Sequence, residues 1–260
     1  MLRRLAPLFT SLAFALVACG GTDAPSKTLA HGTSSSSSSD DGSGTDGTSS
    51  TGTTTSTRVI AASPTDGVAT FYDADGSGNC GYDATPKDLD VVALDLAHYA
   101  GSATCGACLQ VKGPKATVTV RVVDSCPGCA DTGANLDLSA EAFAKIADPK
   151  QGRIDISYQL VACNVTGNLA YHFKDGSSQY WTAIQIRNSK VPVSKLEYQA
   201  NGAWVTMQRQ DYNYFVADKG VGNVKTLALR VTSSDDQVVE DSVTGGIPSD
   251  KTVSGTKQFE

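Results

Sequence analysis

Apolar and polar residues alternate along most of the chain after residue 57. Up to residue 166 the alternation recurs in short segments separated by turn-forming clusters: GVATFY (67–72), LDVVALDL (89–96), CLQVKG (108–113), ATVTVRVVD (116–124) and RIDISYQLVAC (153–163). In the fourth segment Val118, Val120 and Val122 share one face, whereas Thr119 and Arg121 share the other. This pattern predicts strands with one buried side, and the region is interpreted as a compact β-barrel.

One segment of this region has a helical pattern instead. Ser139 suits the N-cap position, Glu141 falls in the first turn, and Phe143 and Ile146 recur on one face. The Asp-Pro pair at 148–149 ends the segment. We therefore expect a short helix after Ser139, with Phe143 and Ile146 facing inward.

The alternation continues beyond residue 167, in WTAIQIRN (181–188), VSKLEYQANGAWVTMQ (193–208), VKTLALRVTS (224–233) and QVVEDSV (237–243). Asn201-Gly202 suits the type I′ turn of a hairpin, and we expect Trp204, just after it, in the core. Regularly spaced strands with hairpins predict a second domain, a small β-sandwich. The domains are expected at 58–166 and 167–260, with the short junction TGN (166–168) holding them against each other.

The N-terminal residues have the composition of an export signal. Arg3 and Arg4 precede an apolar stretch, residues 5–17, that is too short to span a bilayer, and small residues follow it. The sequence Leu-Val-Ala-Cys ending at Cys19 resembles a bacterial lipobox. We therefore expect a signal peptide over residues 1–18 and a lipid anchor on Cys19. An ordinary signal, cut beside an incidental cysteine, is the alternative.

Residues 19–57 are dominated by Ser, Thr, Gly and Asp and contain almost no apolar residue. Such a composition cannot form a core, and the segment is predicted to be a disordered tether. Gly20, rather than Asp, after Cys19 favours sorting to the outer membrane. The expected location is thus an outer-membrane lipoprotein exposed at the cell surface, with secretion as the alternative.

Charge narrows the choice of partners. The net charge of −6 is uneven: residues 58–166 carry 8 Lys and Arg against 13 Asp and Glu, and residues 167–260 carry 10 against 10. No basic face stands out, so nucleic acid is not an expected partner. A polyanion would not be held by net charge either, and a neutral polymer fits best.

Six cysteines remain when Cys19 is set aside, and all lie before residue 167: Cys80, Cys105, Cys108, Cys126, Cys129 and Cys163. An even number in an exported chain predicts three disulfides. The spacing of CGAC (105–108) and CPGC (126–129) also fits a four-cysteine zinc site. Export and the two cysteines that zinc would leave over favour disulfides. CPGC follows a strand and is expected to lead into a loop, so it is interpreted as structural rather than redox-active.

Two aspartates are candidates for polysaccharide chemistry, which normally uses a pair of carboxylates. Asp124 ends an apolar strand, where a carboxyl group is expected to have a raised pKa and to serve as an acid. Asp137 precedes the predicted helix and is expected opposite Asp124. The alternative is that Asp137 only caps and hydrogen-bonds a loop.

Six blocks of the sequence resemble the expansin family: GVATFYDADGSGNCGYD (67–83), CGACLQV (105–111), VVDSCPGC (122–129), NLDLSAEAF (135–143), GNLAYHFKDGSSQYWTAIQIRN (167–188) and DYNYF (211–215). Their order and spacing hold over nearly the whole region after residue 66. The resemblance implies a mainly β chain: a six-stranded double-psi β-barrel, related to glycoside hydrolase family 45 and to barwin, followed by an immunoglobulin-like β-sandwich. The sandwich would be a family 63 carbohydrate-binding module.

For the barrel, the resemblance implies a polysaccharide groove with Thr70 at its border. Asp124 matches the aspartate that resembles the general acid of the hydrolases, and Asp137 matches a further family aspartate. Bacterial expansins have an aromatic residue where this chain has Cys126, so a stacking contact with sugar is either missing here or supplied by another residue such as Tyr72 or Tyr82. The family also implies the pairings Cys80–Cys105, Cys108–Cys163 and Cys126–Cys129.

Expansins lack the catalytic base that the related hydrolases carry shortly after the threonine. Here Asp73 follows Thr70 by three residues and Asp75 lies beyond it, but their register differs from the hydrolase pattern. A DADGSG run is typical of a turn. A functional base at Asp73 is therefore only the alternative.

For the sandwich, the resemblance implies that Tyr180, Trp181 and Tyr212 stack on sugar rings and that Lys174 flanks them. Neighbours on a regular strand point to opposite faces, so Tyr180 and Trp181 can both stack only where the segment is irregular. Otherwise one of them would be a core residue and the other a surface residue.

The sequence thus predicts a monomeric expansin-like protein that binds cellulose or related β-glucans of plant-type cell walls. It would loosen contacts between polymer chains without hydrolysis, and without a cofactor or metal. The alternatives are a weak β-1,4-glucanase with Asp124 as acid and Asp73 as base, a peptidoglycan lytic transglycosylase, and a pure adhesion module.

Overall fold

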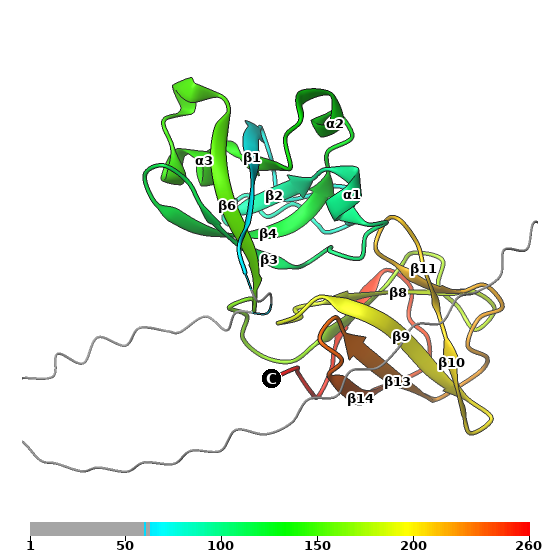
Figure 1. Ribbon diagram of the computed structural model, residues 1–260. Helices are drawn as coiled ribbons and strands as arrows, with labels where there is room; N and C mark the ends of the chain where they lie inside the picture. Colours follow the sequence, from blue (N-terminus) through cyan, green and yellow to red (C-terminus); the bar gives the residue numbers. More distant parts are fainter. Residues whose placement is uncertain (1–59, 61–62) are drawn as a thin grey trace, which may run out of the picture. The chain divides into compact units, whose positions relative to one another are not determined.

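The structure is a computed structural model that describes residue 60 and residues 63–260 (Figure 1). The described residues belong to one compact unit, residues 53–260. The expected signal peptide, Cys19 and the tether lie outside the described residues. None of the helices described is long and apolar enough to cross a membrane.

The first half folds into a closed six-stranded barrel, drawn from cyan to green in Figure 1. Its strands, in the order β1-β5-β2-β4-β3-β6 around the barrel, are β1 (Thr65–Tyr72), β5 (Leu136–Ser139), β2 (Val91–Leu94), β4 (Thr117–Ser125), β3 (Cys108–Lys112) and β6 (Ile154–Val161). The pairs β1–β5 and β2–β4 are parallel and the other four pairs are antiparallel. This is the predicted double-psi barrel.

The barrel core confirms the alternation along β4. Val118, Val120 and Val122 are buried in one cluster with Leu136 and Leu138 of β5. β5 itself has only four residues and was not among the strands that the alternation predicts. The apolar face is worth about 1.5–3 kcal/mol per fully buried Val or Leu side chain relative to exposure.

The predicted helix is α3 (Ala140–Ile146), and its cap and buried face are as expected. The Ser139 side chain accepts a hydrogen bond from the Ala142 backbone N–H (3.1 Å), and Phe143 and Ile146 are fully buried. Three short helices were not predicted: α1 (Leu96–Tyr99), α2 (Cys129–Thr132) and the 3-10 helix η1 (Pro149–Gln151). The expectation that CPGC leads into a loop is therefore wrong, because α2 begins at its second cysteine.

All three disulfides have the expected pairing: Cys80–Cys105, Cys108–Cys163 and Cys126–Cys129. The zinc interpretation is wrong, since each sulfur of the proposed four-cysteine site is already bonded to another sulfur. The sulfurs of Cys126 and Cys129 lie near the carboxylate of Asp137, and the Cys126 Sγ is 3.9 Å from Asp137 Oδ2.

The second half is a β-sandwich of two antiparallel sheets. One has the order β10-β9-β13-β14 and consists of β10 (Ala203–Thr206), β9 (Val193–Ala200), β13 (Thr226–Ser233) and β14 (Val238–Thr244). The other has the order β11-β12-β8-β7-β15 and consists of β11 (Gln208–Arg209), β12 (Phe215–Ala217), β8 (Thr182–Arg187), β7 (Ala170–Phe173) and β15 (Lys251–Ser254). Side chains of both sheets meet in one core that includes Phe173, Ile184, Leu196 and Leu229. The exact domain boundaries, 58–166 and 167–260, stay a prediction.

The predicted hairpin joins β9 to β10. Asn201 (φ 51°) and Gly202 (φ 79°) both have the left-handed backbone that a type I′ turn needs. The expectation that Trp204 is a core residue is wrong. Trp204 is half-buried on the edge strand β10, and the Arg230 guanidinium carbon lies 4.6 Å from its ring centroid. All four residues of β10 are exposed or half-buried, so this strand does not reach the core, and the Trp204 ring packs against a neighbouring cation instead.

Candidate functional site

Three of the candidate residues lie in one row across four neighbouring barrel strands. Asp137 on β5 is the register partner of both Thr70 on β1 and Ala93 on β2. Ala93 is in turn the partner of Asp124 on β4. Two strand spacings therefore separate the backbones of Asp124 and Asp137, about 10 Å. The small side chain of Ala93 lies between the two aspartates. We call Thr70, Tyr72, Asp124 and Asp137 the groove residues.

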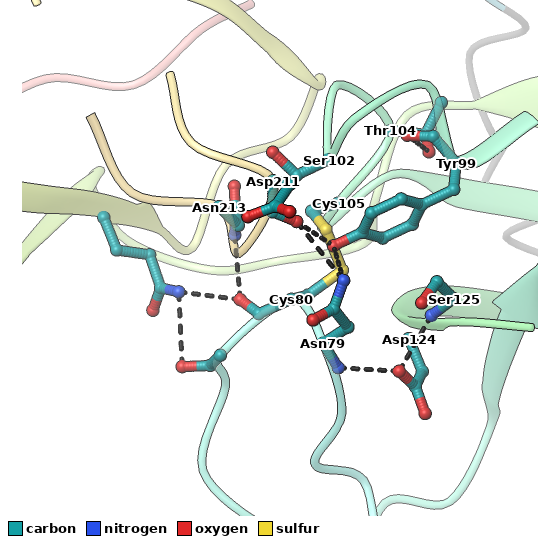
Figure 2. Close-up of a disulfide and its surroundings, with 12 residues drawn as sticks. Asn79, Cys80, Tyr99, Ser102, Thr104, Cys105, Asp124, Ser125, Asp211 and Asn213 are labelled. Atoms are coloured by element: carbon teal, nitrogen blue, oxygen red, sulfur yellow. Dashed lines mark hydrogen bonds between the residues drawn. A yellow bond between two sulfur atoms is a disulfide. The ribbon is translucent and has the colours of Figure 1, made fainter. Parts of the chain in front are cut away.

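Asp124 is held in place by the loop that precedes Cys80 (Figure 2). Its Oδ1 accepts hydrogen bonds from the backbone N–H of Asn79 (2.6 Å) and of Ser125 (2.8 Å). Gly78 permits this close approach, because a Cβ there would lie 2.4 Å from the Asp124 carboxyl carbon. Neither Gly78 nor Asn79 was singled out in the sequence. Among the described residues, Asp124 Oδ2 has no hydrogen-bond partner.

Asp137 is half-buried, and its carboxylate accepts a hydrogen bond from the Thr70 hydroxyl at Oδ1 (2.6 Å). Burial raises the pKa of Asp137, the Thr70 bond lowers it in part, and the charge of Asp124 raises it further. The net effect is a raised pKa. Ser139 caps the helix, and Asp137 instead bonds Thr70 on the neighbouring strand.

Tyr72 follows Thr70 by two residues on β1, so both side chains are on the same face of the strand. Its hydroxyl is buried and has no hydrogen-bond partner among the described residues. Burial raises the pKa of Tyr72, and the charges of Asp124 and Asp137 add to this. A buried hydroxyl without a partner is costly, so this oxygen is a candidate for a bond to water or to a ligand hydroxyl. Of the two tyrosines named as candidates, Tyr72 lies on the same face of β1 as Thr70.

The two candidate bases, Asp73 and Asp75, have different surroundings from those of the groove residues. Asp73 is exposed just after β1. Asp75 closes a turn: its Oδ1 accepts hydrogen bonds from the Ser77 hydroxyl (2.6 Å) and the Ser77 backbone N–H (2.8 Å), which lower the pKa of Asp75. The expected turn is thus confirmed at Asp75, whose carboxylate already has local partners.

A second cluster covers the outer face of the five-stranded sheet. Trp181 and Tyr212 pack on Ala183, Tyr214 and Val216. The ring centroids of Tyr212 and Tyr214 are 5.8 Å apart, and the Lys174 Nζ lies 5.3 Å from the Tyr214 centroid. We call Lys174, Trp181, Tyr212 and Tyr214 the aromatic face. Sequence reasoning missed Tyr214, although its spacing of two from Tyr212 in the segment before β12 was a signal that both share a face.

Tyr180 lies in a tight turn rather than on a strand, and its side chain is 75% exposed. The backbone N–H of Ser178 donates to the Trp181 carbonyl (2.7 Å), and β8 begins only at Thr182. Gly220, with φ +67°, allows its own backbone to pack against the carbonyl of Gln179. The segment is irregular, as simultaneous stacking of Tyr180 and Trp181 requires.

Hydrogen bonds join the loop beside the groove to the loop that carries the aromatic face (Figure 2). The Tyr99 hydroxyl (2.6 Å) and the Asn79 side-chain amide (3.3 Å) both donate to the carbonyl of Asp211, the residue before Tyr212. The Gln185 side chain on β8 donates to the carbonyl of Cys80 (2.8 Å). Asn79 therefore bonds Asp124 through its backbone and the Tyr212 loop through its side chain.

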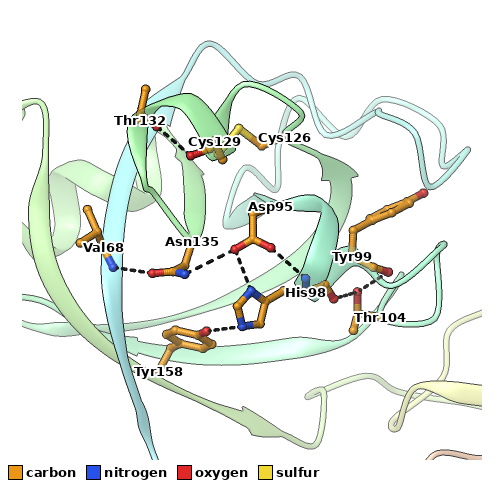
Figure 3. A network of polar contacts seen from close by, with 10 residues as sticks. All are labelled: Val68, Asp95, His98, Tyr99, Thr104, Cys126, Cys129, Thr132, Asn135 and Tyr158. Carbon is orange, nitrogen blue, oxygen red and sulfur yellow. Dashed lines mark hydrogen bonds and ion pairs between the residues drawn. A yellow bond between two sulfur atoms is a disulfide. The ribbon is translucent and has the colours of Figure 1, made fainter.

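A polar network fixes α1, which carries Tyr99 (Figure 3). Asp95 caps this helix by accepting the His98 backbone N–H (2.8 Å), and its Oδ2 lies 2.7 Å from His98 Nδ1. The other ring nitrogen of His98 is 3.1 Å from the Tyr158 hydroxyl on β6. Burial alone would raise the pKa of Asp95, but the bonds and charge of His98 and the bond from Asn135 lower it overall. The network anchors α1 to the barrel wall.

Comparisons with known proteins agree with this fold. A family model described as "Lytic transglycolase" matches residues 65–158. The expansin YoaJ of Bacillus subtilis is 41% identical over 207 residues, which cover 75% of this chain and 86% of that protein. Expansin-like protein 5 of Dictyostelium discoideum is 34% identical over 166 residues, 60% of this chain and 70% of that protein.

Among solved structures, a mutant expansin of Clavibacter michiganensis in complex with cellohexaose aligns with a TM-score of 0.68 and 33% sequence identity. The alignment covers 76% of this chain and 98% of that one, and the same protein without ligand aligns equally well. The fold is thus that of a double-psi β-barrel protein with an added β-sandwich. The chain belongs to the expansin family.

Proposed function

We propose that this protein binds cellulose or a related β-glucan of plant-type cell walls and loosens the contacts between polymer chains without hydrolysis. The observation that carries the proposal is the link through Asn79 and Asp211, which ties the groove residues to the aromatic face. The Clavibacter expansin that this chain resembles has been solved with cellohexaose, which supports the same class of ligand.

In this mechanism the aromatic face supplies affinity by stacking on the flat faces of sugar rings. Tyr180, exposed at its turn, adds a further ring. The groove then takes one glucan chain, whose hydroxyls bond to Asp124 Oδ2, to the Asp137 carboxyl and to the unpartnered Tyr72 hydroxyl. These bonds compete with bonds between polymer chains, so the free energy of binding weakens polymer contacts and no covalent bond breaks.

The alternative is a weak β-1,4-glucanase with Asp124 as acid and Asp73 as base. The exposed position of Asp73 keeps this candidate open to test. A peptidoglycan lytic transglycosylase is a second alternative, and the description of the matching family model favours it. The aromatic face on the second domain argues for cellulose, because aromatic rings stack on the flat faces of glucan sugars.

We further propose that the protein is exported and acts as a monomer. Three disulfides within the barrel favour an oxidising compartment. Cys19 would anchor it as an outer-membrane lipoprotein at the cell surface, with secretion as the alternative. No cofactor or metal enters the mechanism.

The test uses the full chain and three proteins: the native form, Asp124→Asn and Asp73→Asn. One assay measures new reducing ends from mixed-linkage β-glucan, and a second measures extension of cellulosic wall strips under constant load. We expect no reducing ends from any protein. Extension should occur with the native form and with Asp73→Asn, and should be lost with Asp124→Asn, whose side chain presents an amide in place of one acceptor oxygen.

Reducing ends that the native form releases and Asp73→Asn does not would establish the glucanase instead. Anhydro-sugar ends released from peptidoglycan would establish the lytic transglycosylase. Absence of extension with the native form would reduce the protein to an adhesion module, and full extension by Asp124→Asn would overturn the role of Asp124 in loosening.

A further inference from the structure

A cavity of about 650 Å³ lies apart from the candidate site. It is lined by the barrel, by the segment after β6 that begins at Cys163, and by the sandwich. No groove residue and no residue of the aromatic face lines it. The volume falls in the range of about 300–1,000 Å³ that small-molecule sites have.

Three arginines line this cavity together with Tyr82. They are Arg121 on β4, Arg187 at the end of β8 and Arg209 on β11. The Arg121 guanidinium carbon lies 5.3 Å from the ring centroid of Tyr82. Burial raises the pKa of Tyr82, but a hydrogen bond to Asn213 and the positive charges of all three arginines act in the opposite direction. Three cations and one phenol therefore line the same cavity.

Arg209 is a largely desolvated cation without a carboxylate partner among the described residues. Its Nη1 donates to the Ser102 carbonyl (3.1 Å) and to Asn213 Oδ1 (3.3 Å), and its Nη2 donates to the Val193 carbonyl. Within the described part of the chain its Nε–H has no acceptor. Burial lowers the pKa of Arg209 to about 10, which marks the cost of keeping it charged. Its guanidinium also stacks on the Phe215 ring at 4.3 Å.

Arg230 shows what a partnered arginine in the same sandwich looks like. Its Nε and Nη2 donate to the two carboxylate oxygens of Glu197 at 2.8 and 2.9 Å. This side-on bidentate pair is the geometry that guanidinium and carboxylate groups favour. Arg209 lines the cavity and has no such carboxylate partner among the described residues.

The carboxylates that line the cavity do not neutralise Arg121 and Arg209. Asp83 pairs with Arg187 (2.6 Å) and its side chain is 80% exposed. Asp90 pairs with Lys145 (2.6 Å), which lies outside the cavity lining. Asp88, the third, is exposed. The formal charges around the cavity balance, but the carboxylates are paired or face solvent while two guanidinium groups remain without an acidic partner.

We propose that this cavity binds a small organic anion, a carboxylate carried on a hydroxylated ring of the size of a sugar acid. The carboxylate would bond Arg209 and Arg121 through the donor edges that guanidinium groups offer to carboxylates. The Tyr82 and Phe215 rings give the ligand ring apolar walls, and the polar side chain of Asn164 lines the cavity for its hydroxyls. An inorganic anion would fill only a small part of the volume. The site is separate from glucan binding, and the proposal goes beyond the proposed function.

The test follows the arginine Nε–H resonances of the full chain by NMR while glucuronate is added. Glucose and acetate are titrated at matched ionic strength, to separate the ring from the charge. We expect saturable shifts of Arg209 and Arg121 with glucuronate, much weaker binding of acetate, and no shift with glucose.

Two variants probe the site in opposite directions. Arg121→Gln removes a cation that has no hydrogen bond among the described residues, and it should weaken glucuronate about tenfold or more, as the loss of a charged hydrogen bond does. Asp83→Asn frees Arg187 at the exposed rim and should strengthen binding several-fold. Arg153→Gln, which does not line the cavity, should change nothing. Circular dichroism and cellulose pull-down confirm that each variant is folded.

Several results would overturn the proposal. They are the absence of saturation, equal binding of acetate, and unchanged affinity of folded Arg121→Gln. If Arg121→Gln does not fold, an unchanged affinity of Asp83→Asn decides against the site. Because cellulose pull-down is scored separately, failure here is distinct from failure of the glucan-binding function.

Discussion

The barrel and the sandwich of this chain stabilise similar amounts of β-structure by different means. The barrel holds six cysteines in three disulfides, whereas residues 167–260 contain none. Three strands of the barrel, β2, β3 and β5, have five residues or fewer, and loops such as 73–90 are long. In the sandwich, β9, β13 and β14 have seven or eight residues each and belong to one sheet. The disulfide Cys80–Cys105 thus ties the long loop 73–90, which lies outside the strand pairing of the barrel.

The two regions also differ in the chemistry that they expose. The groove residues are polar and fixed by hydrogen bonds, as Asp137 is by Thr70 and Asp124 by Asn79. The aromatic face presents rings that are held by packing, with Lys174 above Tyr214. The groove residues would select a ligand by the geometry of its hydrogen bonds. The aromatic face would gain free energy of binding from the area of sugar ring that it covers. Substitutions in the aromatic face are therefore expected to change the affinity for the polymer, whereas substitutions of groove residues should change only the hydrogen bonds in the groove.

The largest effect is expected from reduction of the disulfides. The bridges Cys80–Cys105 and Cys108–Cys163 close loops of 25 and 55 residues. In the chain-entropy account each contributes roughly 3–4 kcal/mol, and together they rival the whole stability of a small domain. We expect reductant to unfold the barrel and to leave the sandwich folded.

The two tryptophans make this test selective, because Trp181 and Trp204 both lie in the sandwich. With reductant, far-UV circular dichroism should lose the barrel signal while the thermal transition seen by tryptophan fluorescence persists. Loss of both signals at the same reductant concentration would show that the two regions do not fold separately.

The next effect is smaller and concerns binding. Trp181→Ala should weaken binding to insoluble cellulose about tenfold, since it removes a stacking ring from the aromatic face. Trp204→Ala is the matched control: the same residue type is lost from the edge strand of the other sheet. Depletion isotherms of both variants measure the difference. Equal weakening by the two would contradict the assignment of the aromatic face.

Much of the fold could be predicted from the sequence. The alternation of apolar and polar residues predicted β4 and β9, the cap at Ser139 predicted α3, and Asn201-Gly202 predicted the hairpin. These signals are local in sequence, so they can be read without knowledge of the tertiary structure. β5 was missed because four residues give too little alternation to be recognised, although its Leu136 and Leu138 are buried. The prediction that Trp204 lies in the core was wrong because residue type alone does not show that a strand lies at the edge of a sheet.

The candidate site was predictable in its residues but not in its connections. The search for a carboxylate pair supplied Asp124 and Asp137, the resemblance to expansins added Thr70, and the structure places the three in one row. Asn79 carries no comparable signal, since its role depends on Asp211, which is 132 residues away. Contacts of that kind form only when both regions have folded.

The smallest effect is expected from the protonation of Asp137 in the groove. Its pKa is raised in the folded protein, chiefly by burial, so the folded state binds the proton more tightly than the unfolded state does. The free energy of unfolding should therefore fall as pH rises from the unfolded pKa through the folded pKa, and stay level above it. Asp137→Asn keeps an acceptor for Thr70 and removes this loss. It should be slightly more stable than the native form at neutral pH, and the difference should vanish in acid.

Asp75→Asn provides the control of opposite sign. Because the Ser77 bonds lower the pKa of Asp75, its contribution is present above the unfolded pKa and is lost as pH falls through the folded pKa. The variant should thus be less stable than the native form at neutral pH and equal to it in strong acid. Denaturant unfolding at several pH values compares the three proteins. A native-like pH dependence of Asp137→Asn would mean that the groove carboxylate is as well solvated in the folded chain as in the unfolded one. The groove residues and the aromatic face would then still differ in packing, but not in the electrostatic environment of Asp137.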